Sequence, residues 1–337
     1  MFKLLKVLFL CVVIGGGAMG YWVLMMNNIQ PSDKRLFINI PTGVKYADVV
    51  TLLKNNEVLE SMESFDLAAR LKGYKTIKPG HYVFTKKMNN REIVNMLQSG
   101  NQMPVKLVIY NIRTKEEFAG LVGRTLEIDS NELLTKLNDA EFCNQYNVDT
   151  NNILTRFMAD NYELNWNTNI AALMSHLGEA YQQFWHGERE SRVVNMHYTI
   201  PQVVTLASIV EKECMYDKEL PTVAGVYLNR LKIDMPLQAD PTLKFALHDF
   251  DAHRVTNHHK EYDSPYNTYL YKGLPPGPIC MPKKKAIDAV LNAEEHDYIY
   301  FCANPDMSGY SIFSKSLDEQ NKIAVQYRKK LDEMKVH

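Results

Sequence analysis

The sequence lacks most of the short motifs that mark the common enzyme classes. It has no G-x-S-x-G nucleophile elbow and no phosphate-binding P-loop. It also has no internal repeat and no low-complexity tract. These absences disfavour a serine hydrolase of that type, a P-loop nucleotidase and a repeat protein.

The charges of the chain lack a dominant sign. The 337 residues include 38 lysines and arginines and 39 acidic residues, which gives a formal net charge of -1. The basic residues are scattered along the chain rather than gathered in a stripe, so the electrostatic footprint of nucleic-acid binding is missing. We expect no nucleic-acid partner.

Cysteines are few, and no two of them form a C-x-x-C pair. One of them, Cys11, falls in the N-terminal apolar segment, and the others are Cys143, Cys214, Cys280 and Cys302. An exported compartment would permit disulfides, but four cysteines allow three pairings and the spacing selects none of them. We expect no essential disulfide.

Metal-binding spacings are also missing. A cluster of histidines with two nearby acids comprises His248, His253, His258, His259, Glu261 and Asp263. The cluster does not have the H-E-x-x-H spacing of a zinc site, and a polar loop with incidental histidines is the favoured interpretation. We therefore expect no metal and no other cofactor.

One long apolar run is present, at the N-terminus. Residues 4–26 give about 23 positions, enough for a helix to cross a hydrocarbon core of about 30 Å. Lys3 and Lys6 precede most of this run, so the positive-inside bias places the N-terminus in the cytoplasm and the rest on the outer, periplasmic side of the inner membrane. A cleaved signal peptide is the alternative, because Ala18-Met-Gly20 resembles a cleavage site. We favour a retained anchor because the apolar run continues past that site to Met26.

The exported part mixes helix and strand patterns, which predicts an α+β fold. The first predicted elements are strands at 36–40 and 81–85 and a helix at 46–55. A second helix follows, with Asn89 and Glu92 as its capping box and Gly100 as its end. These elements form a unit of about 70 residues. Its functional interpretation is a small carbohydrate-binding module, and the alternative is a plain packing subdomain.

The best-marked helix in the chain leads to two carboxylates. Thr199 can cap its start, with Gln202 three residues later, and Pro201 suits its first turn. Apolar residues at helical spacing then indicate that the helix is largely buried. It ends near Glu211 and Glu213.

The two carboxylates at this helix end cannot share a site. At about 100° per residue, Glu211 and Glu213 project about 200° apart, which rules them out as the paired acid and base of a glycoside hydrolase. Glu213 lies one turn beyond Ile209 and Val210, where desolvation would raise its pKa and keep it protonated as a general acid. The alternative is two solvated carboxylates at a helix end.

Five segments, in order, resemble the MltG (YceG-like) endolytic murein transglycosylases. They are Leu206–Glu213, Val226–Leu231, Leu237–Thr242, Ser264–Tyr269 and Gly273–Ile279. In addition, Pro79–Tyr82 and Leu97–Gly100 resemble the LysM-like subdomain of that family. The resemblance implies a tail and transmembrane anchor over 1–30, a LysM-like subdomain over 31–104 and a mixed α/β catalytic domain over 105–337.

The resemblance also implies an activity. Members of this family are membrane-anchored lyases that cut nascent peptidoglycan strands between N-acetylmuramic acid and N-acetylglucosamine and leave 1,6-anhydro ends. Such cleavage would terminate strand elongation. The implied partners are peptidoglycan strands and the peptidoglycan synthases of elongation or division.

The family's catalytic glutamate falls on Glu213. One carboxylate suffices for such a lyase, because the 6-hydroxyl of the muramoyl residue attacks the anomeric carbon and no water needs activation. Glu213 would first protonate the glycosidic oxygen and then accept the proton of the 6-hydroxyl.

Further site candidates come from the same segments. We expect Gln238, Tyr266 and Asn267 to bind N-acetyl and hydroxyl groups of the substrate, and Asp240 to act as an electrostatic partner. Asn229 and Arg230 would orient the cleft or bind carboxylates, unless their roles are structural.

The chain departs from the family pattern at three places. Ala159–Tyr162 replaces a Pro-Asp-Thr-Tyr segment, and Ser311–Phe313 and Gln320-Asn321 replace positions that usually hold histidine. These differences affect substrate contacts rather than the reaction type. Two alternative functions are a non-catalytic peptidoglycan-binding or septal scaffold protein and a hydrolase.

Overall fold

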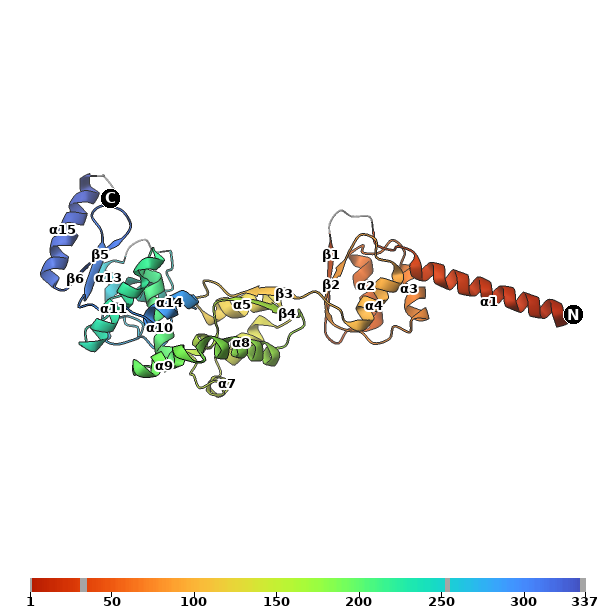
Figure 1. The fold of residues 1–337 in the computed structure, drawn as a ribbon, viewed down its shortest axis with the longest axis horizontal. Coiled ribbons are helices and arrows are strands. Elements are labelled where there is room, and N and C mark those ends of the chain that lie inside the picture. The colour runs from red at the N-terminus through yellow and green to blue at the C-terminus, as the bar shows by residue number, and fades with distance from the viewer. Residues whose placement is uncertain (1, 31–34, 252–254, 334–337) are drawn as a thin grey trace. The chain divides into compact units, whose positions relative to one another are not determined.

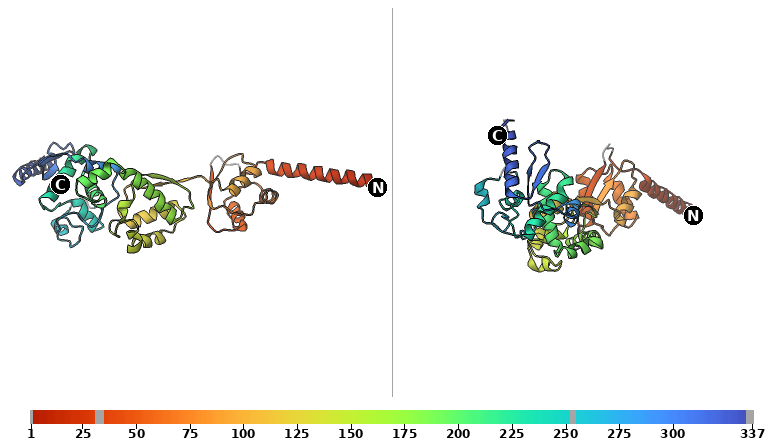
Figure 2. Two further views of the ribbon diagram at one scale, coloured as in Figure 1. Left: turned by 60° about the horizontal axis from the view of Figure 1, so that its bottom comes forward. Right: turned by 60° about the vertical axis from the view of Figure 1, so that its left-hand side comes forward.

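The computed structural model describes residues 2–30, 35–251 and 255–333 (Figures 1 and 2). The chain forms two compact units. Unit 1 comprises residues 1–107, 122–128 and 162–169, and unit 2 comprises residues 108–121, 129–161 and 170–337. Helices predominate and are accompanied by small two-stranded sheets, which confirms the predicted mixture of helix and strand.

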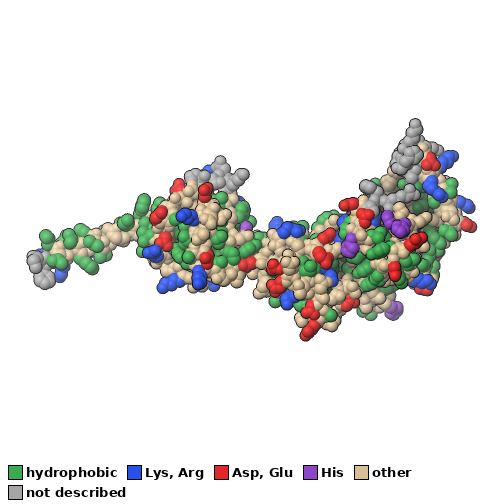
Figure 3. Space-filling model, turned by 180° about the vertical axis from the view of Figure 1, so that it is seen from behind, with side chains coloured by type: hydrophobic (Ala, Val, Ile, Leu, Met, Phe, Trp, Pro, Cys, Tyr) green, Lys and Arg blue, Asp and Glu red, His purple; other side chains and the backbone are tan. Residues whose placement is uncertain are grey.

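Unit 1 begins with α1 (Phe2–Met25), a helix whose surface is mostly apolar (Figure 3). By length and composition, Lys3–Met25 is long and apolar enough to cross a membrane. In the described part of the chain, no other single helix meets this criterion. The finding is compatible with the predicted anchor.

Two strands and three helices form the core of unit 1. They are β1 (Leu36–Ile40), α2 (Tyr46–Asn55), α3 (Met62–Leu71), β2 (Gly80–Phe84) and α4 (Asn90–Ser99). β1 and β2 are antiparallel, with Leu36 opposite Phe84. Alternate strand residues, such as Ile38 and Tyr82, are buried together with the apolar faces of the helices.

Most of these elements were predictable from local signals. β1 and α2 have the predicted bounds, and β2 starts one residue earlier than predicted. The predicted capping box is also present: the Asn89 side chain accepts a hydrogen bond from the Glu92 N–H at 2.9 Å. Gly100 ends α4 with a φ of 76°, a conformation that glycine adopts without strain. α3 was not predicted.

Buried amides join the last turn of α1 to this core. Asn90 Nδ2 donates a hydrogen bond to the Val23 carbonyl at 2.9 Å, which binds α4 to α1. Asn28 Nδ2 donates to the Ser61 carbonyl at 2.8 Å and to Asn90 Oδ1 at 2.7 Å. Asn28 and Asn90 are both fully buried, and an unpaired buried amide would be costly. The end of α1 is therefore part of unit 1.

The boundary between the units passes through one sheet and one helix. β3 (Val105–Val108) pairs with β4 (Asn161–Leu164), and residues of both strands and of α5 (Lys115–Thr125) are divided between the units. The short helices between α5 and β4 are α6 (Ser130–Leu137), α7 (Ala140–Asn144) and η1 (Ile153–Arg156).

Unit 2 is built around α10 (Ile200–Glu213). Residues 203–210 of this helix are all buried. α11 (Leu220–Lys232), α12 (Asp240–Ala246) and α14 (Lys284–Leu291) pack against it. The prediction that this helix is largely buried is confirmed.

Further helices and a hairpin complete unit 2. These elements are α8 (Ile170–Trp185), α9 (Glu188–Asn195), η2 (Asp217–Glu219), α13 (Asn257–Lys260), β5 (Tyr300–Ala303), β6 (Ser311–Ser314) and α15 (Leu317–Glu333). β5 and β6 are antiparallel, and α15 packs against both (Figure 2).

The proline-rich segment 273–279 is docked on α10. The Ile279 N–H donates a hydrogen bond to Ser208 Oγ at 3.0 Å, and Ser208 is buried in the middle of the helix. A β-carbon at Gly277 would lie 2.1 Å from the carbonyl oxygen of Asn151. Only glycine fits at this close approach of two backbone segments.

We therefore expect Gly277→Ala to destabilise unit 2. The added methyl group must displace backbone, so the free energy of unfolding should fall by about 1–3 kcal/mol, as in other overpacked cores. Chemical denaturation in detergent measures this loss. Gly178→Ala is the control, because nothing lies within 4 Å of a β-carbon there and alanine favours the helix by about 0.5–1 kcal/mol. Equal stability of the two variants would contradict the proposed steric constraint.

Candidate active site

The position of Glu213 follows from the helix that carries it. Thr199 caps α10: the Thr199 N–H donates to Gln202 Oε1 at 2.8 Å, while the threonine side chain accepts from the Gln202 N–H. Pro201 occupies the first turn, where no backbone N–H is required. These features confirm the predicted helix start. Glu213 is the last residue of the helix, and the backbone becomes extended at Cys214.

The carboxyl of Glu213 contacts the hydroxyl of Tyr227, on α11. Tyr227 Oη donates a hydrogen bond to Glu213 Oε1 at 3.0 Å. Tyr227 is buried, and Glu213, taken as a whole residue, is of intermediate exposure.

The surroundings of Glu213 favour its protonated form. Burial raises the pKa of Glu213 to about 7, and the negative charge of Asp240 adds to the rise. The Tyr227 hydrogen bond and the positive charges of Arg230 and Lys244 act in the opposite direction. A carboxyl with such a pKa can donate and accept a proton near pH 7.

Asp240 is held by a second tyrosine. Asp240 is the first residue of α12, and the hydroxyl of Tyr269 donates a hydrogen bond to its Oδ1. Burial raises the pKa of Tyr269, and its bond to Asp240 raises it further. Asp240 is therefore a fixed negative charge close enough to act on Glu213.

Arg230 is a buried framework residue of this region. Its Nε donates a hydrogen bond to the Ile299 carbonyl at 2.7 Å, and its Nη1 donates to the Leu237 carbonyl at 2.5 Å. Burial lowers the pKa of Arg230. Its donors connect the segments before β5 and α12, while its charge favours the ionised form of Glu213.

Glu211 has a different partner, as its direction on the helix predicts. Its Oε2 accepts a hydrogen bond from the Lys283 N–H at 2.6 Å, immediately before α14. The positive end of the α14 dipole also stabilises a carboxylate at this position. The two acids are thus separated: Glu211 caps α14 and Glu213 faces Tyr227.

The side chain of Asn267 is used inside its own loop. Asn267 is fully buried, and its side-chain amide donates to the carbonyls of Lys260 and Tyr262 at 3.0 and 2.8 Å. Its Oδ1 accepts from the Tyr269 N–H at 3.0 Å. Because these bonds use both ends of its amide inside the loop, the buried Asn267 side chain does not offer the predicted contact with substrate.

The side-chain amide of Asn229 also bonds to backbone carbonyls. Its Nδ2 donates hydrogen bonds to the carbonyls of His296 and Tyr298 at 2.7 and 3.0 Å. Both carbonyls belong to the segment that leads into β5. These hydrogen bonds of Asn229, like those of Arg230, are thus to backbone carbonyls of neighbouring segments, and Asn229 also lines a pocket.

The two remaining candidates, Tyr266 and Gln238, lie in different surroundings. Tyr266 packs on Phe245 with a ring-centroid distance of 4.7 Å, and burial raises its pKa to about 12. Its hydroxyl lies 3.2 Å from where a β-carbon of Gly277 would be. Gln238 is exposed, two residues before Asp240, and its backbone N–H donates to the Thr268 carbonyl.

Two tyrosines of the site were missed by reasoning from the sequence. Tyr227 and Tyr269 both lie within quoted family segments, but neither was proposed for a role. The contact between Tyr227 and Glu213 spans 14 residues, and that between Tyr269 and Asp240 spans 29. One indication of their roles was present in the sequence: both tyrosines lie in the same short segments as the charged and amide residues that were proposed for the site.

The histidine cluster does not form a metal site in the described part of the chain. Across residues 2–30, 35–251 and 255–333, no group of three or more His, Cys, Asp or Glu side chains is placed to hold a metal ion. His253 lies outside the described residues. His259 instead accepts from the Thr256 N–H through Nδ1, at the start of α13.

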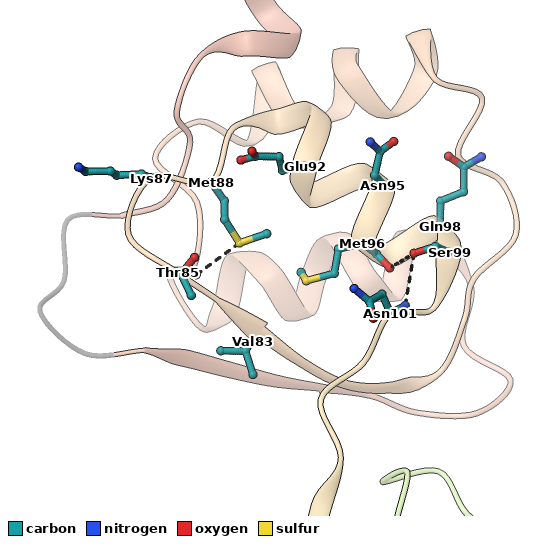
Figure 4. Close-up of a pocket in the computed structure, with 10 residues that line it drawn as sticks. All are labelled: Val83, Thr85, Lys87, Met88, Glu92, Asn95, Met96, Gln98, Ser99 and Asn101. Carbon is teal, nitrogen blue, oxygen red and sulfur yellow. Dashed lines mark hydrogen bonds between the residues drawn. The ribbon is translucent and has the colours of Figure 1, made fainter.

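A cavity of about 890 Å³ belongs to unit 1, whereas Glu213 belongs to unit 2. It lies between β2, the loop that follows and α4 (Figure 4). Val83, Met88 and Met96 supply its apolar lining, and Asn95 and Asn101 are among its polar residues. The side chains of Met88 and Met96 point into the space between the loop and the helix (Figure 4).

Comparison with known proteins gives consistent matches. A model of the YceG-like family matches residues 38–326. An endolytic murein transglycosylase of Bacillus subtilis is 28% identical over 335 residues, covering 94% of this chain and 91% of that protein. One from Streptococcus pneumoniae is 27% identical over 363 residues, covering 96% of this chain and 65% of that protein.

A solved structure is also similar. The crystal structure of a putative yceG-like protein from Listeria monocytogenes aligns with a TM-score of 0.59 and 28% sequence identity. The alignment covers 87% of this chain and 99% of that one.

The opposing effects of Tyr227 and Asp240 on Glu213 lead to a paired prediction. Tyr227→Phe removes a hydrogen bond to the carboxylate and should raise the pKa of Glu213 above about 7, whereas Asp240→Asn should lower it. The carbon-13 chemical shift of the Glu213 carboxyl reports both changes. Its resonance is identified by its loss in Glu213→Gln. Shifts in the same direction in both variants would contradict this electrostatic arrangement.

The raised pKa of Glu213 also predicts how stability depends on pH. Because the folded-state pKa, about 7, exceeds the ordinary value of 4.5, the folded state binds more protons between these values. The resulting stabilisation is fully present below pH 4.5 and is lost as the pH rises through 7. Glutamine does not titrate, so Glu213→Gln should gain stability relative to wild type from pH 5 to pH 8.

Denaturant titration of both proteins at the two pH values measures this gain. The difference between variant and wild type cancels the titration of all other groups. A difference that is constant with pH would show that Glu213 has an ordinary pKa.

Proposed function

The chain belongs to the YceG-like family, and on this premise we propose that Glu213 is the catalytic acid of an endolytic peptidoglycan transglycosylase. Cleavage of peptidoglycan by transglycosylation, a lyase-type reaction, is the function that the names of its relatives support. The observation that carries the assignment of Glu213 is a carboxyl at the end of a buried helix, with a pKa of about 7, beside the buried Tyr227 hydroxyl.

In the first step, protonated Glu213 acts as a general acid. It donates its proton to the oxygen that links N-acetylmuramic acid to N-acetylglucosamine, and the bond from the anomeric carbon to this oxygen breaks. The N-acetylglucosamine part leaves with the new hydroxyl. Positive charge develops on the anomeric carbon and the ring oxygen of the muramoyl residue.

In the second step, ionised Glu213 acts as a general base. It accepts the proton of the muramoyl 6-hydroxyl while the oxygen of that hydroxyl forms a bond to the anomeric carbon. The product is a 1,6-anhydro end, and Glu213 is again protonated. The atoms balance without water, so a single carboxyl serves both steps, and a pKa near 7 suits both roles.

Asp240 would stabilise the positive charge between these steps. It carries a negative charge that acts on Glu213, and Tyr269 fixes its orientation by a hydrogen bond. A preorganised carboxylate near a developing cation lowers the energy of the transition state. The charge also keeps Glu213 protonated before the reaction.

Substrate contacts would come from exposed polar groups. Gln238 is exposed and two residues from Asp240, so we assign it to the N-acetyl or hydroxyl groups of a sugar. Tyr266 remains a candidate at the edge of the proline-rich segment. Asn229, Arg230 and Asn267 would hold the framework around these groups.

Unit 1 would hold the enzyme near its substrate. We propose that α1 anchors the chain in the cell membrane with a cytoplasmic N-terminus, as the lysines at its start indicate. We also propose that residues 31–104 are a LysM-like subdomain that binds peptidoglycan. A cavity with an apolar lining and amide groups supports this role. Peptidoglycan synthases of elongation or division are the proposed protein partners, and strand termination is the proposed outcome.

A non-catalytic scaffold is not favoured. A scaffold has no need of a carboxyl whose pKa is raised into the neutral range, and such perturbed groups concentrate at catalytic sites. The relatives are named as enzymes. A hydrolase would differ in its product, because water attack leaves a reducing end.

We expect Glu213→Gln to abolish the formation of 1,6-anhydro ends from uncrosslinked glycan strands, because glutamine can neither donate nor accept the proton. Mass spectrometry of the released fragments measures these ends. Glu211→Gln is the matched control: it changes a carboxyl two residues away that caps α14, and its product yield should stay near that of wild type.

Circular dichroism of each variant verifies folding. Equal yields of anhydro ends from wild type and Glu213→Gln would refute the assignment. Reducing ends without loss of one water would identify a hydrolase instead.

A further inference from the structure

α3 lies beside the last turns of α1. Ser61, just before α3, is hydrogen-bonded to Asn28, beyond the end of α1. At the other end of α3, a β-carbon on Gly20 of α1 would lie 3.8 Å from Leu71 Cδ1. α3 therefore runs antiparallel to the last turns of α1, and Figure 1 shows the two helices side by side.

The C-terminal end of α3 therefore lies beside the apolar part of α1 that is long enough to cross a membrane. With a rise of 1.5 Å per residue, a hydrocarbon core of about 30 Å takes about 20 residues of α1. If the core begins between residues 4 and 7, its outer boundary falls between residues 23 and 26. Gly20, and with it Leu71, then lies roughly 5–9 Å inside that boundary.

The side chains at this level are suited to a lipid environment. Leu67 and Leu71 are one turn apart on α3 and are 40% and 54% exposed. On α1, Tyr21 and Trp22 are 67% and 63% exposed at the same level. Tyrosine and tryptophan are the residues that gather at membrane interfaces.

Positive charges follow directly in the chain. The segment from Leu67 to Lys78 contains Arg70, Lys72, Lys75 and Lys78 and no acidic residue. Arg70 is paired with Asp66 within α3, whereas Lys75 is exposed after the helix end. Basic residues next to an apolar insertion bind anionic headgroups.

We propose that the C-terminal end of α3 is a membrane-docking surface: Leu67 and Leu71 insert into the bilayer that α1 spans, and Lys72 and Lys75 bind anionic headgroups there. The proposal rests on the proposed anchoring role of α1. It is independent of the chemistry at Glu213.

Spin labelling of the full-length protein in nanodiscs tests the insertion. A nitroxide is placed at position 71 through Leu71→Cys, after the native cysteines are replaced by serine, and its collision rates with oxygen and with a water-soluble nickel chelate are measured. We expect frequent collisions with oxygen and a several-fold lower collision rate with the chelate than at Lys54→Cys. Lys54 is a suitable control because its charge acts on Glu63, at the opposite end of α3.

Each other outcome has a defined meaning. Chelate collisions at position 71 equal to those at the control would overturn the proposal, as would low collision rates with both reagents, which would indicate cover by protein. A label at Ile14→Cys tests the premise: if it is accessible to the chelate, α1 does not span the bilayer and the proposal also fails. Release of anhydro ends from glycan strands by the same samples tests the proposed function separately.

A second arm tests headgroup binding. Nanodiscs of phosphatidylcholine alone are compared with nanodiscs that also contain phosphatidylglycerol. The label at position 71 should be better protected from the chelate in the anionic nanodiscs, and Lys72→Glu with Lys75→Glu should remove this difference. Lys54→Glu should leave it intact. Equal protection in both lipids for the parent protein would overturn the headgroup assignment.

Discussion

The burial of α10 is the constraint on which unit 2 depends. Eight consecutive residues, 203–210, are enclosed, so neighbouring elements contact the helix on several sides. A helix fixed in this way has no rotational freedom. The directions of the two acids in its last turn are therefore determined: Glu211 points to the start of α14, and Glu213 points to Tyr227.

The electrostatics of Glu213 depend on the same packing. The apolar surroundings disfavour its ionised form, while Arg230 and Lys244 favour it and Asp240 disfavours it. Two carboxylates in one site usually divide the roles of acid and base. Here the second carboxylate, that of Asp240, accepts a hydrogen bond from Tyr269, which fixes its position. This arrangement is consistent with a reaction in which one group exchanges the proton in both directions.

Local signals predicted the elements well, because capping and periodicity involve residues within four positions of each other. The start of α10 at Thr199, the Asn89 capping box and the separation of Glu211 from Glu213 all follow from such short-range geometry. The roles within the site depend on distant contacts. The sequence patterns do not reveal that Tyr227 meets Glu213, nor that the Asn267 amide is used by the carbonyls of its own loop.

The buried amides that bind α1 to unit 1 have a mechanical consequence. Asn90 fixes the carbonyl of Val23, so the last turn of the helix and the core of unit 1 move as one body. A spanning helix changes its tilt when the thickness of the bilayer changes. With α1 in a bilayer, unit 1 would tilt by the same angle. The thickness of the membrane would thereby set the orientation of unit 1 relative to the plane of the bilayer.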